Sequence, residues 1–350
     1  PCENGTYQSD IAQVSCDFAD VGHYVDQTAQ TNQIPCSSGT YQAAVGQTSC
    51  DNASLGHYVD QTGQSTQIPC DVGTYQGDIG QISCDDADAG YYVPTIGQSV
   101  QNPCENGTYQ SDIAQVSCDF ADVGHYVNQT AQTNQIPCSL GNYQVAIGQT
   151  SCDNASAGHY VDQIGQSSQI ACSPGAYQPS TGQTECFDAD LGHYVASYGQ
   201  VSQTFCPIGT YQQYTGQPNC DDASMGHYVN QTTQSSQIAC SLGTYQPATG
   251  QSSCDNASLG HYVDQTGQSS QIACLPGTYQ SEKAQTSCDL SDVGHYVAYS
   301  GESNQTECGL GTYQSATGQS SCDDADIGYY VDQIGQNSQI NCPIGNSTIS

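Results

Sequence analysis

Cationic side chains are almost absent from this sequence, and their absence excludes several classes of partner. The 350 residues contain one Lys or Arg against 34 Asp and Glu, and the formal net charge is −33. Nucleic acids and anionic membrane surfaces are bound through clusters of Lys and Arg. We therefore expect no nucleic-acid partner, and we interpret the charge as a source of solubility and of repulsion between chains.

Large apolar side chains are also scarce, which argues against ordinary globular domains. Trp is absent, Met occurs once and Phe four times. No stretch approaches the length of a transmembrane helix, so we expect no membrane insertion in this part of the sequence. Tyr, Val and Cys carry most of the apolar area. Small units with so little core usually depend on disulfides, and we expect many such units rather than two or three domains.

What the sequence does contain is a strict repeat. The triplet Gly-x-Tyr returns with a constant 17-residue period, without insertion or deletion, at Tyr7, Tyr24, Tyr41 and onward to Tyr330. A constant period indicates a stack of equivalent units. No residue then stands out as a unique catalytic centre, and we expect no enzymatic activity.

The cysteines double this period. A shorter gap, as from Cys2 to Cys16, alternates strictly with a longer gap, as from Cys16 to Cys36, so the full 34-residue repeat has two halves. The first half carries Cys2 and Cys16; in the second, Ala19 and Gln33 occupy the corresponding positions. The predicted array spans 1–350 and consists of full repeats 2–35, 36–69, 70–103, 104–137, 138–171, 172–205, 206–239, 240–273, 274–307 and 308–341, with a partial repeat 342–350.

The paired replacement of cysteines predicts the disulfides. The two cysteines on either side of the shorter gap are present together in one half and missing together in the other, so we pair them with each other; spacing alone does not prove connectivity, and pairing across the longer gap is the rival. Each bond contributes roughly 3 kcal/mol in a chain-entropy model. The predicted bonds are Cys2–Cys16, Cys36–Cys50, Cys70–Cys84, Cys104–Cys118, Cys138–Cys152, Cys172–Cys186, Cys206–Cys220, Cys240–Cys254, Cys274–Cys288 and Cys308–Cys322. Cys342 is left over, because its partner would lie beyond residue 350.

Each half is predicted to be a β-hairpin. Residues 5–8, Gly-Thr-Tyr-Gln, are typical of a short strand, and residues 47–50 exemplify the second strand. No apolar pattern of period 3.6 occurs, so we expect little or no helix. The predicted fold is an all-β, elongated tandem-repeat rod of disulfide-linked hairpins. A series of glutamines that includes Gln13, Gln30 and Gln47 is expected to bond to the turn or to the backbone of the next unit.

A third level of order has a 102-residue period, which is three repeats. Isoleucine occurs two positions before most of the first cysteines, as at Ile34, but every third repeat has Asn102, Thr204 or Thr306 there. Either a three-repeat block was recently duplicated, or every third repeat meets a different environment, as in a superhelix or a lateral contact.

The motif Cys-x-x-Gly-Thr-Tyr-x, turn, Gly-Gln-x-x-Cys resembles the ephrin-receptor-like cysteine-rich repeats, relatives of tumour-necrosis-factor-receptor modules. The resemblance covers nearly all of the chain. Those repeats usually carry a cysteine pair in every half and a Cys-x-x-Cys junction, of which Cys16-Asp17-Phe18-Ala19 keeps only the first cysteine. The resemblance implies an extracellular, rod-like, disulfide-linked β structure, no enzymatic activity and no specific ligand.

Neither the histidines nor the cysteines predict a catalytic or zinc site. All eight histidines occupy one phase of the repeat, where Tyr91 and Tyr329 take the same place. A residue that is exchangeable with Tyr is a structural ring rather than a base. No close cysteine pair has zinc spacing, and oxidised thiols are not nucleophiles.

Two acidic clusters are the only candidates for a metal. They lack the glycine and the terminal glutamate of an EF-hand loop, so weak surface binding of Ca²⁺ competes with the more ordinary interpretation of a solvated acidic loop. No other cofactor is expected. The cluster residues are Asp85, Asp86, Asp88, Asp323, Asp324 and Asp326.

Asn-x-Ser/Thr sequons recur with the long period, which favours N-linked glycans on a secreted chain, although Asn is also common in turns. The many Ser and Thr permit O-linked sugars at positions that the sequence does not locate. The sequons are at Asn4, Asn52, Asn106, Asn128, Asn154, Asn230, Asn256, Asn304 and Asn346.

These observations favour a structural extracellular protein that forms a glycosylated fibre, filament, or surface or matrix component. Its expected partner is itself, in a head-to-tail or continuous filament. The chain starts at Pro1 and ends within a repeat without atypical caps, and open ends of this kind suit a unit that continues into more of itself. The alternative is an adhesin stalk or a receptor-like ectodomain whose binding domain lies outside this sequence.

Overall fold

A computed structural model describes residues 1–343, and all of the regular secondary structure in that range is β-strand. Each half supplies two strands of two residues. The odd-numbered strands begin with β1, Thr6–Tyr7, and recur once in each half to β39, Tyr329–Tyr330; the even-numbered strands run in the same way from β2, Asp17–Phe18, to β40, Ile340–Asn341. The prediction of an all-β array of 17-residue hairpins is thus confirmed. No helix that could cross a membrane occurs in the described part of the chain.

Each hairpin is antiparallel and pairs an odd strand with the next even strand. In the first hairpin Thr6 lies opposite Phe18 and Tyr7 opposite Asp17. The second strand lies further along the chain than predicted, at Asp51–Asn52 in β6 rather than at residues 47–50. Residues 46 and 47 are not free to pair within their own hairpin, because they bond to the preceding half: Gly46 N donates to Ala19 O, and Gln47 O accepts from Val25 N.

Backbone hydrogen bonds between halves replace a continuous sheet. From the second half to the third, Gly22 N donates to Gln42 O at 2.7 Å and Val25 N donates to Gln47 O at 3.0 Å. The equivalent bonds recur from each half to the next, for instance from Gly39 N to Val59 O. Two-residue hairpins are too small to be stable alone, so each half depends on the backbone groups of its neighbours.

The Gly-x-Tyr glycine is required by contact with the next half of the same kind. Gly22 has φ +78°, and a Cβ there would overlap the carbonyl oxygen of Gly63, which belongs to the following repeat. Gly5 meets Gly46 in the same way. Disulfide-containing halves therefore touch each other, as do the halves without disulfides, and a side chain at this glycine would force them apart.

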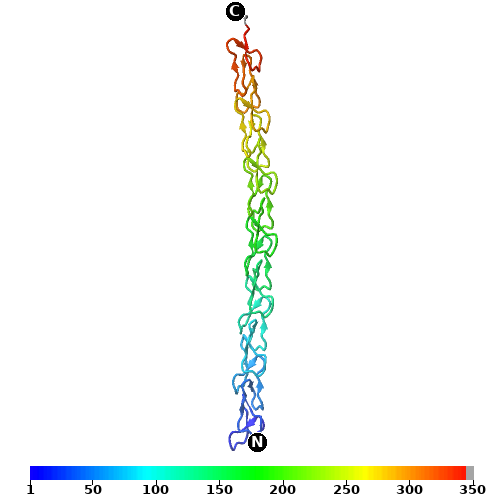
Figure 1. Ribbon diagram of the computed structural model, residues 1–350. Helices are drawn as coiled ribbons and strands as arrows, with labels where there is room; N and C mark the ends of the chain where they lie inside the picture. The colour runs from blue at the N-terminus through cyan, green and yellow to red at the C-terminus, as the bar shows by residue number, and fades with distance from the viewer. Residues whose placement is uncertain (344–350) are drawn as a thin grey trace. The chain divides into compact units, whose positions relative to one another are not determined.

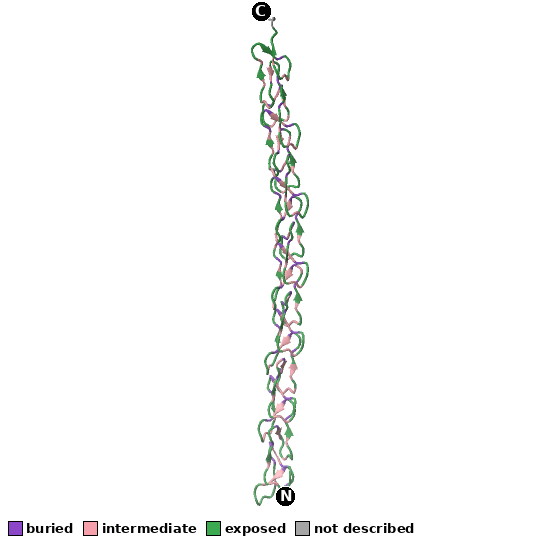
Figure 2. Cartoon of the chain, viewed as in Figure 1, coloured by how far each residue is buried: buried purple, intermediate pink, exposed green. Residues whose placement is uncertain are grey.

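The buried residues are small. Ala19, Val25 and Cys36 are fully buried and their equivalents recur down the chain, together with a buried glutamine such as Gln42. The tyrosines of the repeat are half-buried instead, from Tyr7 to Tyr313. Buried stretches recur along the chain between exposed ones (Figure 2). A core made of such small side chains leaves much of the stability to hydrogen bonds and disulfides.

The chain divides into two compact units. Unit 1 comprises Pro1–Ala171 and Ser180–Glu185; unit 2 comprises Cys172–Pro179 and the chain from Cys186 onward. Within each unit the hairpins follow one another in sequence order, from blue to green in unit 1 and from green to red in unit 2 (Figure 1).

Candidate functional site: closure of each half-repeat

Ten disulfides close the first half of each repeat. In each, one cysteine follows the even strand of the preceding half or begins the array, and the other immediately precedes an even strand; for Cys36–Cys50 the Cα atoms are 5.8 Å apart. The bonds join the cysteines on either side of the shorter gap, as predicted, namely Cys2–Cys16, Cys36–Cys50, Cys70–Cys84, Cys104–Cys118, Cys138–Cys152, Cys172–Cys186, Cys206–Cys220, Cys240–Cys254, Cys274–Cys288 and Cys308–Cys322.

A glutamine closes the second half where the disulfide is missing. Gln33 Oε1 accepts from Asp20 N at 2.6 Å, and Gln33 Nε2 donates to Asp20 Oδ2 at 2.7 Å. Asp20 follows Ala19, the residue that replaces the first cysteine. The two hydrogen bonds therefore span nearly the same loop as the disulfide does, and we call this pair the glutamine clasp.

The clasp has two forms, depending on the residue that follows the buried alanine or serine. Where that residue is Asp, the glutamine commonly bonds to both the backbone N–H and the carboxylate; where it is Ser, the carboxamide oxygen accepts from the backbone N–H and, at Ser54, also from the hydroxyl at 2.8 Å. The signal was present in the sequence, since this position is always Asp or Ser. The clasp pairs are Asp20–Gln33, Ser54–Gln67, Asp88–Gln101, Asp122–Gln135, Ser156–Gln169, Asp190–Gln203, Ser224–Gln237, Ser258–Gln271, Asp292–Gln305 and Asp326–Gln339.

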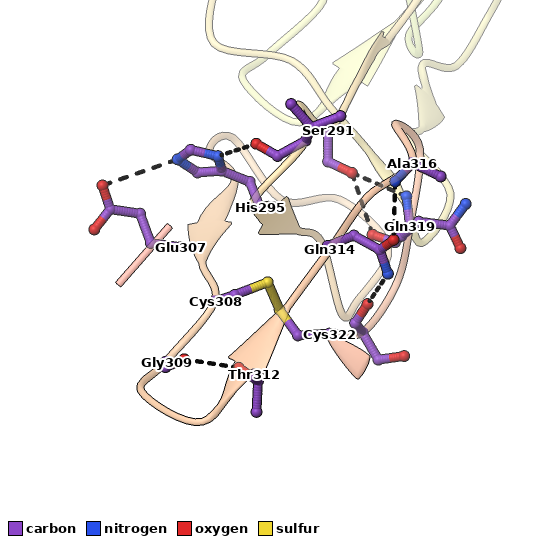
Figure 3. Close-up of a disulfide and its surroundings, with 12 residues drawn as sticks. Ser291, His295, Glu307, Cys308, Gly309, Thr312, Gln314, Ala316, Gln319 and Cys322 are labelled. Atoms are coloured by element: carbon purple, nitrogen blue, oxygen red, sulfur yellow. Dashed lines mark hydrogen bonds and ion pairs between the residues drawn. A yellow bond between two sulfur atoms is a disulfide. The ribbon is translucent and has the colours of Figure 1, made fainter. Parts of the chain in front are cut away.

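A second glutamine, which sequence reasoning overlooked, organises the loop of each disulfide half. Gln314 is buried; its Nε2 donates to Ser321 O at 2.9 Å and its Oε1 accepts from Ala316 N at 3.0 Å, beside the Cys308–Cys322 bond (Figure 3). The carboxamide thereby serves the backbone at both ends of an irregular loop. The sequence did carry a signal for this glutamine, because it recurs only in the disulfide halves, at the end of the run Gly-Thr-Tyr-Gln. The buried members are Gln42, Gln76, Gln110, Gln144, Gln178, Gln212, Gln246, Gln280 and Gln314.

The glutamines that were predicted to bond to the turn do so in part. Gln47 Nε2 donates to Val45 O at 3.3 Å, within its own turn. Its stronger contribution comes from the main chain, because Gln47 O accepts the Val25 N–H of an earlier half. Any residue at position 47 could make this main-chain bond. The hydrogen bonds therefore explain only in part why glutamine recurs at this position of the repeat.

Ser291, the one exception among the alanines, is accommodated by a backbone pair. It is fully buried, its Oγ donates to Gln319 O at 3.2 Å, and it accepts from Gln319 N at 2.9 Å (Figure 3). The hydroxyl is therefore satisfied inside the core, where an unpaired one would be costly.

The histidines occupy strand positions and contact the main chain. In every one of the eight, Nδ1 lies 3.1 to 3.4 Å from the carbonyl oxygen two positions earlier, as between His57 and Leu55. His295 also has Nε2 at 3.9 Å from Glu307 Oε1. Tyr91 takes the same strand position opposite Pro103 that His57 takes opposite Pro69. These contacts are those of a structural ring.

The acidic clusters are divided between a strand and a clasp. Asp85 and Asp86 form β10 opposite Tyr75 and Thr74, whereas Asp88 accepts from Gln101 Nε2 at 2.6 Å. Asp323, Asp324 and Asp326 repeat the arrangement, with Asp326 bonded to Gln339. Among residues 1–343, no group of three or more His, Cys, Asp or Glu side chains is arranged to hold a metal ion.

The carboxylates act on the tyrosine beside them. Burial, followed by the charges of Asp88 and Asp85, raises the pKa of Tyr75 above its usual 10.0. The pKa values of Tyr109 and Tyr279 are raised in the same way, each by burial and then by its own two aspartates. These phenols stay neutral through the physiological range, as half-buried packing groups require.

All of the sequon asparagines in the described range are exposed, which is the condition for carrying a glycan. Asn52, Asn154 and Asn256 lie in even strands, and Asn128 and Asn230 in the loops that follow odd strands. The others in this range are Asn4, Asn106 and Asn304. Asn346 lies outside the described residues, and Cys342 is exposed as a free thiol.

Comparison of the chain with protein-family models and with curated proteins gave no match. The resemblance to ephrin-receptor-like repeats therefore stays a prediction from the motif. What the geometry itself defines is a disulfide-rich tandem-repeat β protein, in which a covalent and a hydrogen-bonded closure alternate.

Proposed function

We propose that this chain is a structural extracellular protein that builds a glycosylated fibre, filament, or surface or matrix component. One observation carries the proposal: the same contacts recur at every step of the array. Gly5 N bonds to Val25 O, Gly22 N to Gln42 O and Gly39 N to Val59 O. A chain whose units all make the same contacts is suited to bearing load and extending, and a site for one ligand would interrupt that regularity.

The closures support the proposed compartment. Ten disulfides are typical of proteins that mature in an oxidising environment, and they would be reduced in the cytosol. Exposed sequons such as Asn52 and Asn154 are compatible with glycosylation there. The resemblance to ephrin-receptor-like repeats agrees with the same compartment and adds no ligand.

The partner proposed for this function is another copy of the same chain. The backbone N–H and C=O groups through which one half bonds to the next recur in every half of the same kind. Further repeats, in the same chain or in a second copy, would therefore meet complementary groups. Head-to-tail contacts that do not close produce filaments.

Electron microscopy of the native material, combined with its intact mass before and after removal of N-linked sugars, tests the proposal. We expect filaments with an axial period related to the 34-residue repeat or to the 102-residue period, and a mass that falls on deglycosylation. Discrete monomers without sugar would contradict the proposal and favour an adhesin stalk or receptor-like ectodomain.

A further inference from the structure

The sequons fall into two groups in the folded chain, although all of their asparagines in the described range are exposed. Ser and Thr share a hydroxyl group, so an enzyme that accepts either residue two positions after the asparagine reads that hydroxyl. Such an enzyme must reach the asparagine and the hydroxyl at the same time. Exposure of the asparagine decides whether the fold tolerates an attached sugar, and the state of the hydroxyl decides whether the folded sequon can be read.

The sequon at Asn52 is closed, because its hydroxyl residue belongs to a glutamine clasp. Ala53, the middle residue, is fully buried, and its N–H donates to Gly39 O at 2.9 Å. Ser54 Oγ donates to Gln67 Oε1 at 2.8 Å. The middle of the sequon therefore lies inside the fold, and the hydroxyl that an enzyme would read is already bonded.

The same closure recurs at the two equivalent positions of the 102-residue period, Asn154 and Asn256. The middle alanine of each sequon is fully buried. Ser258 Oγ donates to its clasp glutamine at 2.9 Å, and the backbone N–H of Ser156 donates to its own at 2.6 Å. An enzyme could read either sequon only after the clasp and the buried alanine had been pulled out of the fold.

Three further sequons are held by other contacts. At Asn4 and Asn106 the threonine hydroxyl donates to the backbone carbonyl three residues earlier, at 2.7 and 2.8 Å, and the glycine between is buried. At Asn304 the middle residue is Gln305, whose carboxamide bonds through both of its polar atoms to Asp292. We call these six the closed sequons: Asn4, Asn52, Asn106, Asn154, Asn256 and Asn304.

The sequons at Asn128 and Asn230 are open. Each lies in the loop after an odd strand, and all three residues of each, 128–130 and 230–232, are exposed. Within residues 1–343, neither threonine hydroxyl of these two sequons has a hydrogen-bond partner. The middle glutamine of each only accepts from a glutamine three residues later, at 3.5 and 3.4 Å, which leaves the hydroxyl accessible.

From this difference we infer that folding divides the sequons by the time at which they are modified. The closed sequons receive sugar only before their half has folded, whereas Asn128 and Asn230 remain acceptors on the folded chain. The inference rests on the proposed function, since it concerns a chain that meets the transfer enzyme. In the transfer, Asn Nδ2 bonds to the anomeric carbon of an oligosaccharide carried on a lipid diphosphate, the bond from that carbon to the diphosphate oxygen breaks, and the amide loses one proton.

Disulfide formation competes with this transfer at three of the closed sequons. Asn52, Asn154 and Asn256 each follow the second cysteine of a disulfide half by two positions, as Asn52 follows Cys50 of the Cys36–Cys50 bond. Closing that bond fixes the loop that leads into the strand of the asparagine. The open sequons lie in halves without disulfides, so oxidation leaves them unaffected.

Transfer of sugar to the purified full chain tests the inference. The chain is produced in an oxidising compartment without N-glycosylation, and is offered to a purified oligosaccharyltransferase and a lipid-linked oligosaccharide, either oxidised or reduced and alkylated. Peptide mass spectrometry measures the occupancy of each asparagine. We expect Asn128 and Asn230 to be modified in both forms, and the closed sequons to be modified at least about tenfold less in the oxidised chain than in the reduced one.

Two substitutions within one repeat provide matched controls. Asp60→Asn creates a sequon at residues 60–62, which are exposed and equivalent to 128–130, and this sequon should accept sugar on the folded chain while Asn52 does not. Gln67→Ala frees the Ser54 hydroxyl and should raise the occupancy of Asn52 alone, because the clasps beside Asn154 and Asn256 stay intact. Hydrogen exchange verifies that the oxidised variants are folded and that the reduced chain is not.

Three results would overturn the inference. They are equal occupancy of Asn52 and Asn128 on the folded wild-type chain, a reduced chain that still refuses sugar at the closed sequons, and an occupancy of Asn52 that Gln67→Ala leaves unchanged. The transfer is measured on protein made without sugar, so these results do not depend on whether the native material is glycosylated. The mass of the native material tests the proposed function separately.

Discussion

At the scale of single residues, backbone conformation rather than side-chain chemistry sets the strictest requirements. Gly56 has φ +76°, and a Cβ there would overlap the carbonyl of Gly97. Gly77 lacks a left-handed φ, and a Cβ there would lie 3.5 Å from Ser99 O, an ordinary contact. The two glycines therefore differ widely in the substitutions that they tolerate.

We predict that Gly56→Ala opens the array locally and that Gly77→Ala does not. The left-handed conformation alone costs alanine about 1–2 kcal/mol, and the overlap with Gly97 adds to that. Hydrogen exchange of the amides in repeats 36–69 and 70–103, which contain Gly56 and Gly77 respectively, together with urea unfolding of the whole chain, measures the effect. Equal protection in the two variants would show that the close approach is easily relieved.

Thr233 is a residue whose replacement should stabilise the protein. It has φ +66°, in a turn position where most repeats have glycine and others have alanine. Thr233→Gly should raise local stability by about 1 kcal/mol, because a β-branched residue is strained there, less the entropy that glycine loses on folding. The matched control is Thr232→Gly, at a neighbouring residue without positive φ, which should only destabilise. Thermal unfolding compares them; a loss at both positions would contradict the account.

At the scale of the hairpin, the clasp and the disulfide are alternative closures of one loop. The clasp of Gln135 joins both the N–H and the carboxylate of Asp122, at 2.6 and 2.7 Å, whereas that of Gln67 joins the N–H and the hydroxyl of Ser54. The partner therefore decides what the glutamine can be replaced by.

Gln135→Glu should destabilise its half in a pH-dependent way, and Gln67→Glu should be tolerated. The Asp122 carboxylate raises the pKa of the glutamate introduced at 135 above its unfolded value. Stability is then intact below the unfolded pKa of about 4.3 and is lost as the pH rises through the raised value. At Ser54 both partners are donors, which a carboxylate accepts. Urea unfolding between acidic and neutral pH distinguishes the variants; a loss at neutral pH that acid does not restore would contradict the role of the carboxylate.

A disulfide half should be convertible into a clasp half. Cys70 is followed by Asp71, Val72 and Gly73, as Ala19 is followed by Asp20, Val21 and Gly22. Cys70→Ala combined with Cys84→Gln places a glutamine at the same separation from Asp71 as Gln33 has from Asp20 in the native clasp. The disulfide supplies roughly 3 kcal/mol of stability, which the variant Cys70→Ala with Cys84→Ala loses. We expect the introduced glutamine to recover about 1 kcal/mol of that loss. Equal unfolding midpoints in the two variants would mean that the clasp also requires residues of its native half that lie outside this loop.

At the scale of the whole molecule, exposure of the asparagines predicts where sugar is attached. Asn52, Asn154 and Asn256 are exposed and occupy equivalent positions of the 102-residue period. We expect them to be modified together, because the transfer enzyme meets the same local sequence and exposed position each time. Peptide mass spectrometry after enzymatic release in heavy water marks each occupied asparagine. Occupancy at only one of the three would show that position in the chain, and not local structure, controls modification.

The sequence by itself determined the period, the absence of helix from residues 1–343, the hairpin unit and the pairing of the cysteines. It could do so because cysteine bonds only to cysteine, so the loss of one partner is recorded as the loss of the other, and because an unbroken period forces every unit into one geometry. The first strand was predicted correctly, but the second was misplaced because its position depends on neighbours: residues 46 and 47 bond to Ala19 and Val25, and that leaves Asp51–Asn52 for the hairpin.

Only the tertiary structure decided how the halves without cysteines are closed and which side chains form the core. Gln42 bonds to backbone groups, which every residue carries, so its partners leave little trace in the sequence. Gln33 leaves a partial trace, because the position of its partner Asp20 is always Asp or Ser. The contact of Gly22 with Gly63 likewise joins a glycine to a carbonyl of the following repeat. Side-chain identity encodes the covalent closure, whereas hydrogen bonds to the main chain become visible only when the chain is folded.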